Sequence, residues 1–403
     1  MAEADSVSQE EAVAMEDNRF SSASRIKKKH LKELGLHWFA KHIDEGYFVE
    51  ESVSISVSEQ EAFRACAKTC YEHYEQGLEA VFAKGYDPAF GLSAKLWSLA
   101  ETTFRQRGRY QHIFGRFDIA GITNRMPGQL IEFNADTATV LAEAALVQLM
   151  QLGKKPQWNE IIDHLAAGLK EIAGNKAPEE TNVLIMTMGG GEDDDNATVW
   201  KLAAEQAGLY CDIGHLPSVT FSEEEGVFRQ LNEDEWIQYG IVVKMFPWDW
   251  IDREEPELLD LLIPIVENDL ATIINPPYTS LMQSKGMLVA LAEQFPDSKH
   301  ILRAGWDDRP TGIGSYVSKP LFGREGENVR VYNGNGLREE AEGDYGDQPR
   351  IWQQFVELPK DSDGDLYQAG VYWAKLPCGI AYRRRDGLII DEDAEFIAHQ
   401  IKD

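Results

Sequence analysis

Residues 115–120 read Gly-Arg-Phe-Asp-Ile-Ala, and residues 129–134 read Gln-Leu-Ile-Glu-Phe-Asn. Both runs have the composition of short β-strands, and the segment between them contains Pro127 and Gly128. Because Pro presets φ and Gly tolerates positive φ, such a segment favours a tight reversal of the chain. We therefore expect a β-hairpin here, and the rest of the fold is predicted outward from it.

The polar side chains of this hairpin form the first candidate site. Arg116 and Asp118 are two residues apart and share one face of their strand, as Glu132 and Asn134 do on the next. Asp118, Glu132 and Asn134 are hard oxygen ligands of the kind that hold Mg²⁺ beside nucleotide phosphates. A guanidinium such as Arg116 can stabilise charge on a transferring phosphoryl group. The alternative interpretation is a solvated hairpin face with a surface ion pair.

The chain around the hairpin predicts an α/β fold. Apolar residues recur at three- and four-residue steps between 58 and 83, which indicates an amphipathic helix with Ser58 near its start. The apolar run 182–188 ends in three glycines before a helical stretch at 197–207, which is typical of a strand–loop–helix unit in an open sheet. Short strands and many glycines between 316 and 390 predict an antiparallel lobe.

Composition excludes several classes of function. The 68 acidic and 39 basic residues give a formal net charge of −29, which disfavours nucleic acid and anionic membrane surfaces as partners. No apolar stretch approaches the roughly 20 residues of a membrane span, and residues 1–18 contain no signal-peptide core. The four cysteines lack a Cys-x-x-Cys pair, which favours a reducing compartment. We therefore expect a cytoplasmic enzyme.

A second constellation lies about 150 residues after the hairpin. Lys285 follows the segment Asn-Pro-Pro-Tyr-Thr, and Lys319 ends an apparent strand before a glycine loop. Gly323 and Gly326 allow a backbone to approach phosphate oxygens, and Arg324 adds a positive charge. The loop is not a P-loop, since it lacks Gly-x-x-x-x-Gly-Lys-Ser/Thr. Taken alone, it is better explained as a hairpin corner whose glycines satisfy turn geometry.

In this order the segments resemble a known family. FGRFD, EFNADT, NPPYT with the following SK, YVSKPLFGREGENV, WQQFVELP and GIAYRR resemble the synthetase domain of the glutathionylspermidine synthase family, over roughly residues 34–400. The resemblance implies an α/β (α+β) protein with the ATP-grasp fold, in which two lobes close on ATP. We expect a mobile tail at 1–33, a helical region with the metal-binding hairpin at 34–180, an α/β substrate domain at 181–274 and the ATP-grasp lobes at 275–403.

The resemblance also implies cofactors and residue roles. ATP and Mg²⁺ are the implied cofactors, and the implied magnesium ligands are Asp118, Glu132 and Asn134. Two arginines are implied at the reaction centre, Arg116 and Arg383, although Arg384 and Arg385 follow the second directly. Together with the glycine-loop residues, the expected ATP-binding set comprises Lys285, Lys319, Gly323, Arg324, Gly326, Gln353 and Gln354.

The implied reaction joins a carboxylate to an amine through an acyl phosphate, with glutathione and a polyamine such as spermidine as substrates. Thr137 and Thr139 partly keep the hydroxyl residues that bind the thiol substrate in relatives, and Arg116 is expected beside them. From the acidic run 192–195, we expect Asp194 and Asp195 to bind the cationic amine, although a helix cap explains the run equally well. The alternatives are the same ligase chemistry on another peptide or amine, or a catalytically idle nucleotide-binding protein.

Overall fold

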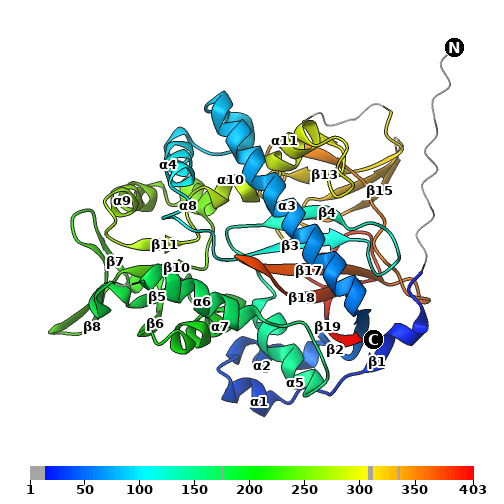
Figure 1. Cartoon of the computed structure of the whole chain (residues 1–403), viewed down its shortest axis with the longest axis horizontal. Coiled ribbons are helices and arrows are strands. Elements are labelled where there is room, and N and C mark those ends of the chain that lie inside the picture. The colour runs from blue at the N-terminus through cyan, green and yellow to red at the C-terminus, as the bar shows by residue number, and fades with distance from the viewer. Residues whose placement is uncertain (1–13, 175, 307–311, 335) are drawn as a thin grey trace.

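The computed structural model of this chain describes residues 14–174, 176–306, 312–334 and 336–403. Within these residues the chain forms four sheets with helices packed against them, so the expected mixed α/β class is confirmed (Figure 1). None of the described helices is long and apolar enough to cross a membrane. The segments predicted from 115 to 134 lie near the middle of the molecule, beside the C-terminal strands of the same sheet (Figure 1).

The expected hairpin is present as β3 (Gly115–Ala120) and β4 (Gln129–Asn134). Phe117 pairs with Phe133, and their rings stack 3.7 Å apart on the buried face. The neighbouring positions in the register therefore place the polar side chains of both strands on the opposite face. The hairpin is the edge of a seven-stranded sheet with the order β1-β2-β19-β18-β17-β3-β4. Its other strands are β1 (Phe20–Ser22), β2 (Phe48–Ser56), β17 (Leu366–Ala374), β18 (Leu376–Arg385) and β19 (Glu395–Lys402).

Helix α3 (Val57–Lys84) crosses the seven-stranded sheet diagonally (Figure 1). Its cap is Ser56 rather than the expected Ser58, because the Ser56 hydroxyl accepts from the Glu59 amide and Glu59 accepts from the Ser56 amide. The apolar positions predicted for its inner face are buried in one core with the phenylalanines of the hairpin. This packing fixes the hairpin from behind and leaves its polar face open.

The expected segment boundaries need two corrections. Residues 1–13 of the predicted tail lie outside the described residues, but residues 14–33 pack on the body of the protein. Met15 is buried, β1 pairs with β2, and Arg19 forms an ion pair with Glu59 at 2.7 Å. The C-terminal strands, expected in a separate lobe at 275–403, pair with β3 of the hairpin through β17. Long-range strand pairing of this kind leaves no local sequence signal.

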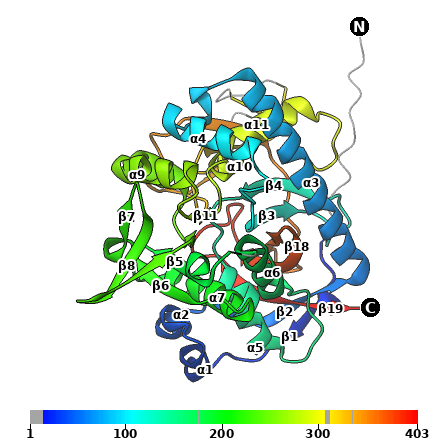
Figure 2. The ribbon, with the colours of Figure 1, turned by 60° about the vertical axis from the view of Figure 1, so that its left-hand side comes forward.

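A four-stranded parallel sheet forms the expected α/β layer, in the order β11-β10-β5-β6. Helix α7 (Glu192–Gln206) starts directly after the three glycines, so the acidic run is its first turn. Carboxylates suit this position because they face the positive end of the helix dipole. Helix α6 (Ile161–Ala173) packs between α7 and the seven-stranded sheet (Figure 2). The strands are β5 (Val183–Thr187), β6 (Cys211–His215), β10 (Ile241–Lys244) and β11 (Thr272–Ile274).

The antiparallel lobe expected after residue 316 contains a five-stranded sheet in the order β12-β16-β13-β14-β15. Its strands are β12 (Ala304–Gly305), β13 (Ser315–Pro320), β14 (Arg330–Asn333), β15 (Gly336–Glu340) and β16 (Arg350–Gln354). A smaller sheet projects from the parallel layer and consists of β7 (Thr220–Ser222), β8 (Gly226–Asn232) and β9 (Glu235–Tyr239).

The remaining helices cover the edges of these sheets (Figures 1 and 2). The helix expected at 138–152 starts at residue 141 and contains a π-helical segment, Glu143–Val147, before α5 (Gln148–Leu152). The others are α1 (Lys28–Glu33), α2 (His37–His42), α4 (Ala94–Arg105), α8 (Trp248–Glu254), α9 (Pro256–Glu267), α10 (Thr279–Gln283) and α11 (Gly286–Gln294).

Candidate active site

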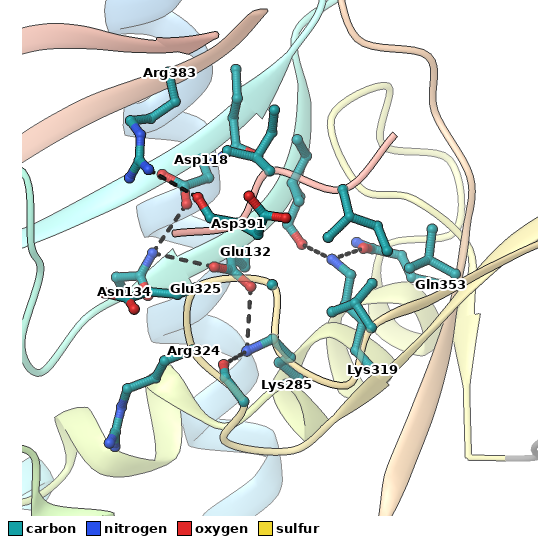
Figure 3. Close-up of a pocket in the computed structure, with 18 of the residues that line it drawn as sticks. Asp118, Glu132, Asn134, Lys285, Lys319, Arg324, Glu325, Gln353, Arg383 and Asp391 are labelled. Carbon is teal, nitrogen blue, oxygen red and sulfur yellow. Dashed lines mark hydrogen bonds and ion pairs between the residues drawn. The ribbon is translucent and has the colours of Figure 1, made fainter. Parts of the chain in front are cut away.

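A cavity, which we call the central cavity, lies between the polar face of the hairpin and the five-stranded sheet (Figure 3). The glycine loop 321–328 and the segment 388–391 close two of its sides. Residues predicted from distant parts of the chain line this one cavity. They are Arg116, Asp118, Glu132, Asn134, Thr137, Thr139, Lys285, Lys319, Gly323, Arg324, Gly326, Gln353, Gln354 and Arg383.

The hairpin contributes a buried ion pair. Arg116 donates from Nε to Oδ1 of Asp118 at 2.7 Å and from Nη2 to Oδ2 at 3.0 Å. A third donor, Nη1, reaches the carbonyl oxygen of Thr139 at 2.9 Å, which fixes the guanidinium plane. Burial raises the pKa of Asp118 and opposes the effect of Arg116, which lowers it. The arrangement holds a cation and an anion at the bottom of the cavity with little freedom to move.

Two lysines stabilise the negative charge of Glu132, the second carboxylate of the hairpin. Lys285 lies 3.3 Å from Glu132 and also donates to the carbonyl oxygen of Gly323 at 2.7 Å. Burial alone would raise the pKa of Glu132, but Lys285 and Lys319 lower it to about 2. Lys319 donates to Gln353 at 2.9 Å, and burial lowers its pKa to about 8. Gln353 therefore orients a lysine as well as lining the cavity.

The polar groups of the hairpin fit a hard divalent cation. Asp118 and Glu132 supply carboxylate oxygens, and the amide of Asn134 lies 3.2 Å from the first and 3.4 Å from the second (Figure 3). In the structure Asn134 turns its nitrogen toward these carboxylates, so its oxygen faces a ligand only after the amide rotates. Carboxylate and amide oxygens are the donors that Mg²⁺ prefers. These three residues would hold the metal.

The two glycines of the loop are required by close packing. A Cβ on Gly326 would lie 2.8 Å from the backbone oxygen of Ile390, and its φ of +73° is rarely adopted by other residues. A Cβ on Gly323 would lie 2.4 Å from Pro320. Arg324 lines the cavity, but both oxygens of Asp249 accept from its guanidinium at 3.0 Å, and it points away from Glu132 in Figure 3. The guanidinium of Arg324 is therefore paired with Asp249 and does not contact Glu132 or Lys285.

Arg383 lies where the central cavity meets a second one. Its Nε donates to the carbonyl oxygen of Ala394 and its Nη2 to that of Asp391, both at 2.9 Å. Arg383, Thr139 and Glu325 line both cavities. The second cavity, which we call the acidic cavity, is further lined by aromatic, histidine, glycine and valine residues and by carboxylates. These are Trp38, Phe39, His42, Glu45, Gly46, Tyr47, Phe48, Val140, Glu192, Glu392, Asp393 and Glu395.

Both residues of the expected amine-binding pair accept hydrogen bonds from other parts of the chain. Asp195 accepts from the backbone amides of Trp38 at 3.2 Å and Phe39 at 2.9 Å, and it is buried. Asp194 accepts from Thr187 at 2.7 Å and from the amide of Gly190 at 2.9 Å. Asp195 therefore holds backbone in the first turn of α2, Asp194 holds backbone just before α7, and neither residue lines the two cavities. Glu192 is the residue of the same run that lines the acidic cavity.

Several lining residues were not expected. Glu325 belongs to the glycine loop, but a single acidic residue in a turn does not by itself indicate a binding site. The apolar wall of the central cavity comes from β13, β14 and two loops, and includes Val317, Val331, Leu358 and Ile389. The sequence signal that could have identified Val317 and Val331 is a β-branched apolar residue within a strand-like run. No pattern pointed to Tyr47.

Comparisons with known proteins indicate the family of this chain. The family profile described as glutathionylspermidine synthase preATP-grasp matches residues 19–402. A Haemophilus influenzae protein provisionally named an acid–amine ligase is 28% identical over 317 residues, which span 75% of this chain and 77% of that protein. Trypanothione synthetase of Crithidia fasciculata is 24% identical over 343 residues, which span 78% of this chain and 50% of that protein.

A solved structure shares the fold. The glutathione synthetase-like effector of Globodera pallida superimposes with a TM-score of 0.52 and 10% sequence identity, over 94% of this chain and 98% of its own. At that identity the likeness concerns architecture alone. The match of the family profile to nearly the whole chain identifies this protein as a member of the glutathionylspermidine synthase family with an ATP-grasp fold.

Proposed function

We propose that the chain is an ATP-dependent ligase that joins the glycine carboxylate of glutathione to a polyamine such as spermidine. The observation that carries this proposal is the meeting of two cavities at Arg383. The central cavity combines lysines, arginines and metal-type oxygen ligands, whereas the acidic cavity combines carboxylates and aromatic rings. Such a pair of chambers suits an anionic nucleotide on one side and a cationic substrate on the other.

The nucleotide fits the central cavity. The apolar wall that includes Val317, Val331 and Leu358 offers a surface for a purine ring. Lys285 and Lys319 stand between that wall and the hairpin, where phosphate oxygens would lie. Magnesium at Asp118, Glu132 and Asn134 would neutralise negative charge on the transferring phosphoryl group.

The chemistry requires an activated carboxylate. A carboxylate is a poor electrophile, so its oxygen first attacks the γ-phosphorus of ATP, which gives an acyl phosphate and ADP. The amine then attacks the carbonyl carbon, and phosphate leaves. Arg116, which is held by Asp118 and Thr139, is placed to stabilise charge on the transferred group. Thr137 and Thr139 line the same cavity and are the proposed contacts of the peptide substrate.

The amine fits the acidic cavity. Glu192, Glu392 and Glu395 lie on its walls, and multiple carboxylates attract a chain that carries several positive charges. Tyr47 and Trp38 add ring faces that attract ammonium groups. A formal net charge of −29 also favours a cationic partner over an anionic one.

A product assay tests the proposal directly. The protein is incubated with ATP, magnesium, glutathione and a panel of mono-, di- and polyamines, and the products are analysed by mass. The expected result is an amide with loss of one water, together with ADP and phosphate in equal amounts. Formation of AMP and pyrophosphate would refute the acyl-phosphate route, and absence of amide with every amine would refute the substrate assignment. An amide formed only with an amine other than a polyamine would support the same ligase chemistry with a different amine substrate.

A further inference from the structure

One buried carboxyl group beside the acidic cavity has no role in the scheme above. Glu143 is the first residue of the π-helical segment and is fully buried. Its Oε1 accepts a hydrogen bond from the hydroxyl of Tyr47 at 2.5 Å, whereas its Oε2 has no hydrogen-bond partner among the described residues. A buried polar atom without a partner is costly, so its retention calls for a functional reason.

Tyr47 connects this carboxyl group to the acidic cavity. The tyrosine lines that cavity, and its ring lies 5.6 Å from the guanidinium carbon of Arg383. It stacks on Phe39 at 6.1 Å and packs edge-on against Phe48 at 4.9 Å, so its ring is held firmly. Tyr47 thus links the cavity that would receive an amine to the buried carboxyl group, which its hydroxyl contacts.

We propose that Glu143 accepts the proton of the amine substrate and acts through the hydroxyl of Tyr47. This inference rests on the proposed function, because an ammonium ion has no free electron pair with which to attack an acyl phosphate. Tyr47 would contact the substrate. Glu143 would hold the hydroxyl of Tyr47 in place and take up its proton, without touching the substrate itself. π-Helical segments often occur at functional sites, which agrees with this placement.

The proton balance is simple. An N–H bond of the bound ammonium breaks, and its proton moves to the oxygen of Tyr47. The former hydroxyl proton of Tyr47 moves to Oε1 of Glu143, whose carboxylate becomes a neutral acid. The nitrogen keeps the electron pair, forms the C–N bond to the acyl carbon, and phosphate leaves with the electrons of the C–O bond.

The charges around Glu143 suit a reversible acceptor. Burial and the nearby carboxylate of Glu192 raise the pKa of Glu143 to about 8, while Tyr47 and Arg383 lower it. Tyr372, on β17, also interacts electrostatically with this carboxyl group, which raises the pKa of the tyrosine. The carboxyl group is therefore mainly neutral in the empty protein near neutral pH. A cation in the acidic cavity favours its ionised form, so substrate binding itself prepares the base.

The first test measures proton release without any turnover. Spermidine is titrated into the protein by calorimetry near pH 7 in two buffers with different ionisation enthalpies, with no ATP present. We expect the wild-type protein to release a fraction of a proton for each spermidine bound. Glu143→Gln should abolish this release, whereas the control Glu205→Gln, at the exposed far end of α7, should keep it. Equal release by wild type and Glu143→Gln refutes the assignment of Glu143.

The second test uses the pH dependence of amide formation. For the wild type, kcat/KM for the amine should rise with pH through about 8, where Glu143 is half ionised, and level off above that pH. Glu143→Gln and Tyr47→Phe should each lower kcat/KM about 100-fold and remove the rising limb of the pH profile. The double variant should be no worse than either single variant, because both act on one proton path.

The outcomes separate this inference from the proposed function. If the wild type makes no amide with any amine, the proposed function fails, and the calorimetric test still decides whether Glu143 responds to a bound cation. If the wild type makes amide but Glu143→Gln retains the limb near pH 8, the proton path is refuted. A loss of activity in Tyr47→Phe with an unchanged pH limb would also refute it, since a merely structural role would not shift the profile.

Discussion

Replacing Glu143 with Gln should stabilise the folded protein in alkaline solution. Glutamine keeps the shape of the side chain and an oxygen that accepts from Tyr47, but it never ionises. In the folded chain the pKa of Glu143 is raised from 4.5 to about 8 by burial and by Glu192. Between these two pH values the folded protein keeps a proton on Glu143 that the unfolded chain has lost. The stability that this proton supplies is fully present below about pH 4.5 and is lost as the pH rises through about 8.

The magnitude follows from the same difference in pKa. One pKa unit corresponds to about 1.4 kcal/mol, so ionisation of Glu143 above pH 8 destabilises the folded wild type by up to about 5 kcal/mol. Structural relaxation and water entry reduce such penalties, so about 2 to 5 kcal/mol is expected. Below the unfolded pKa both variants are neutral at this position, and their stabilities should differ by less than about 1 kcal/mol.

Urea unfolding of wild type and variant at about pH 5, 7 and 9, followed by tryptophan fluorescence, measures this difference. Other titrating groups affect both proteins equally and cancel in the comparison. Glu205→Gln serves as the control, because its side chain is half exposed and its substitution should give the same small difference at every pH. If the advantage of Glu143→Gln were the same at pH 5 and pH 9, the carboxyl group would ionise in the folded state without penalty, and the reasoning would fail.

Three further predictions concern the central cavity. Asn134→Ala should weaken magnesium-dependent ATP binding about tenfold or more, whereas Arg116→Lys should mainly lower kcat, because only the arginine acts on charge that develops during transfer. Nucleotide titrations measure the ATP affinity and steady-state kinetics measure kcat. If each variant changed ATP affinity and kcat equally, these separate roles of Asn134 and Arg116 would be wrong. ATP affinity should fall as the pH rises through about 8, because Lys319 loses its proton there, and Lys319→Met should remove this dependence without altering the fold. Gly326→Val should strain the loop at a φ of +73° and lower the amide yield per ATP consumed, which paired ADP and product assays would reveal; an unchanged ratio would show that the loop does not protect the acyl phosphate.

Local patterns were sufficient for the elements that surround the site. The hairpin β3–β4 was predicted with its bounds, because a Pro-Gly turn between two apolar runs is a short-range signal. Helix α3 was predicted from the three- and four-residue spacing of its apolar residues, and strand β5 from a continuous apolar run that ends in three glycines. The family resemblance then placed residues such as Lys285 and Gln353 at one cavity, although their separation in the chain hides this from pattern alone.

What could not be predicted depends on pairing and rotation. The sequence predicts a helix only from residue 197, whereas α7 starts at Glu192, and each residue of a helix turns its side chain by about 100° from the previous one. Hence Asp195 faces α2, while Glu192 faces the acidic cavity. Tyr47 comes from a segment more than ninety residues before Glu143, and no local pattern joins the two.

The largest sheet brings together strands from both ends of the sequence, with β2 parallel to β19 and β3 next to β17. During synthesis on a ribosome, β2 and β3 emerge long before β17, β18 and β19 exist. Their edges stay unpaired during that time, and open strand edges are prone to misassociation. The sheet that contains Asp118 and Glu132 is therefore complete only after its C-terminal strands are made, and Arg383 lies on one of them, so a nascent chain has no complete site with which to consume nucleotide.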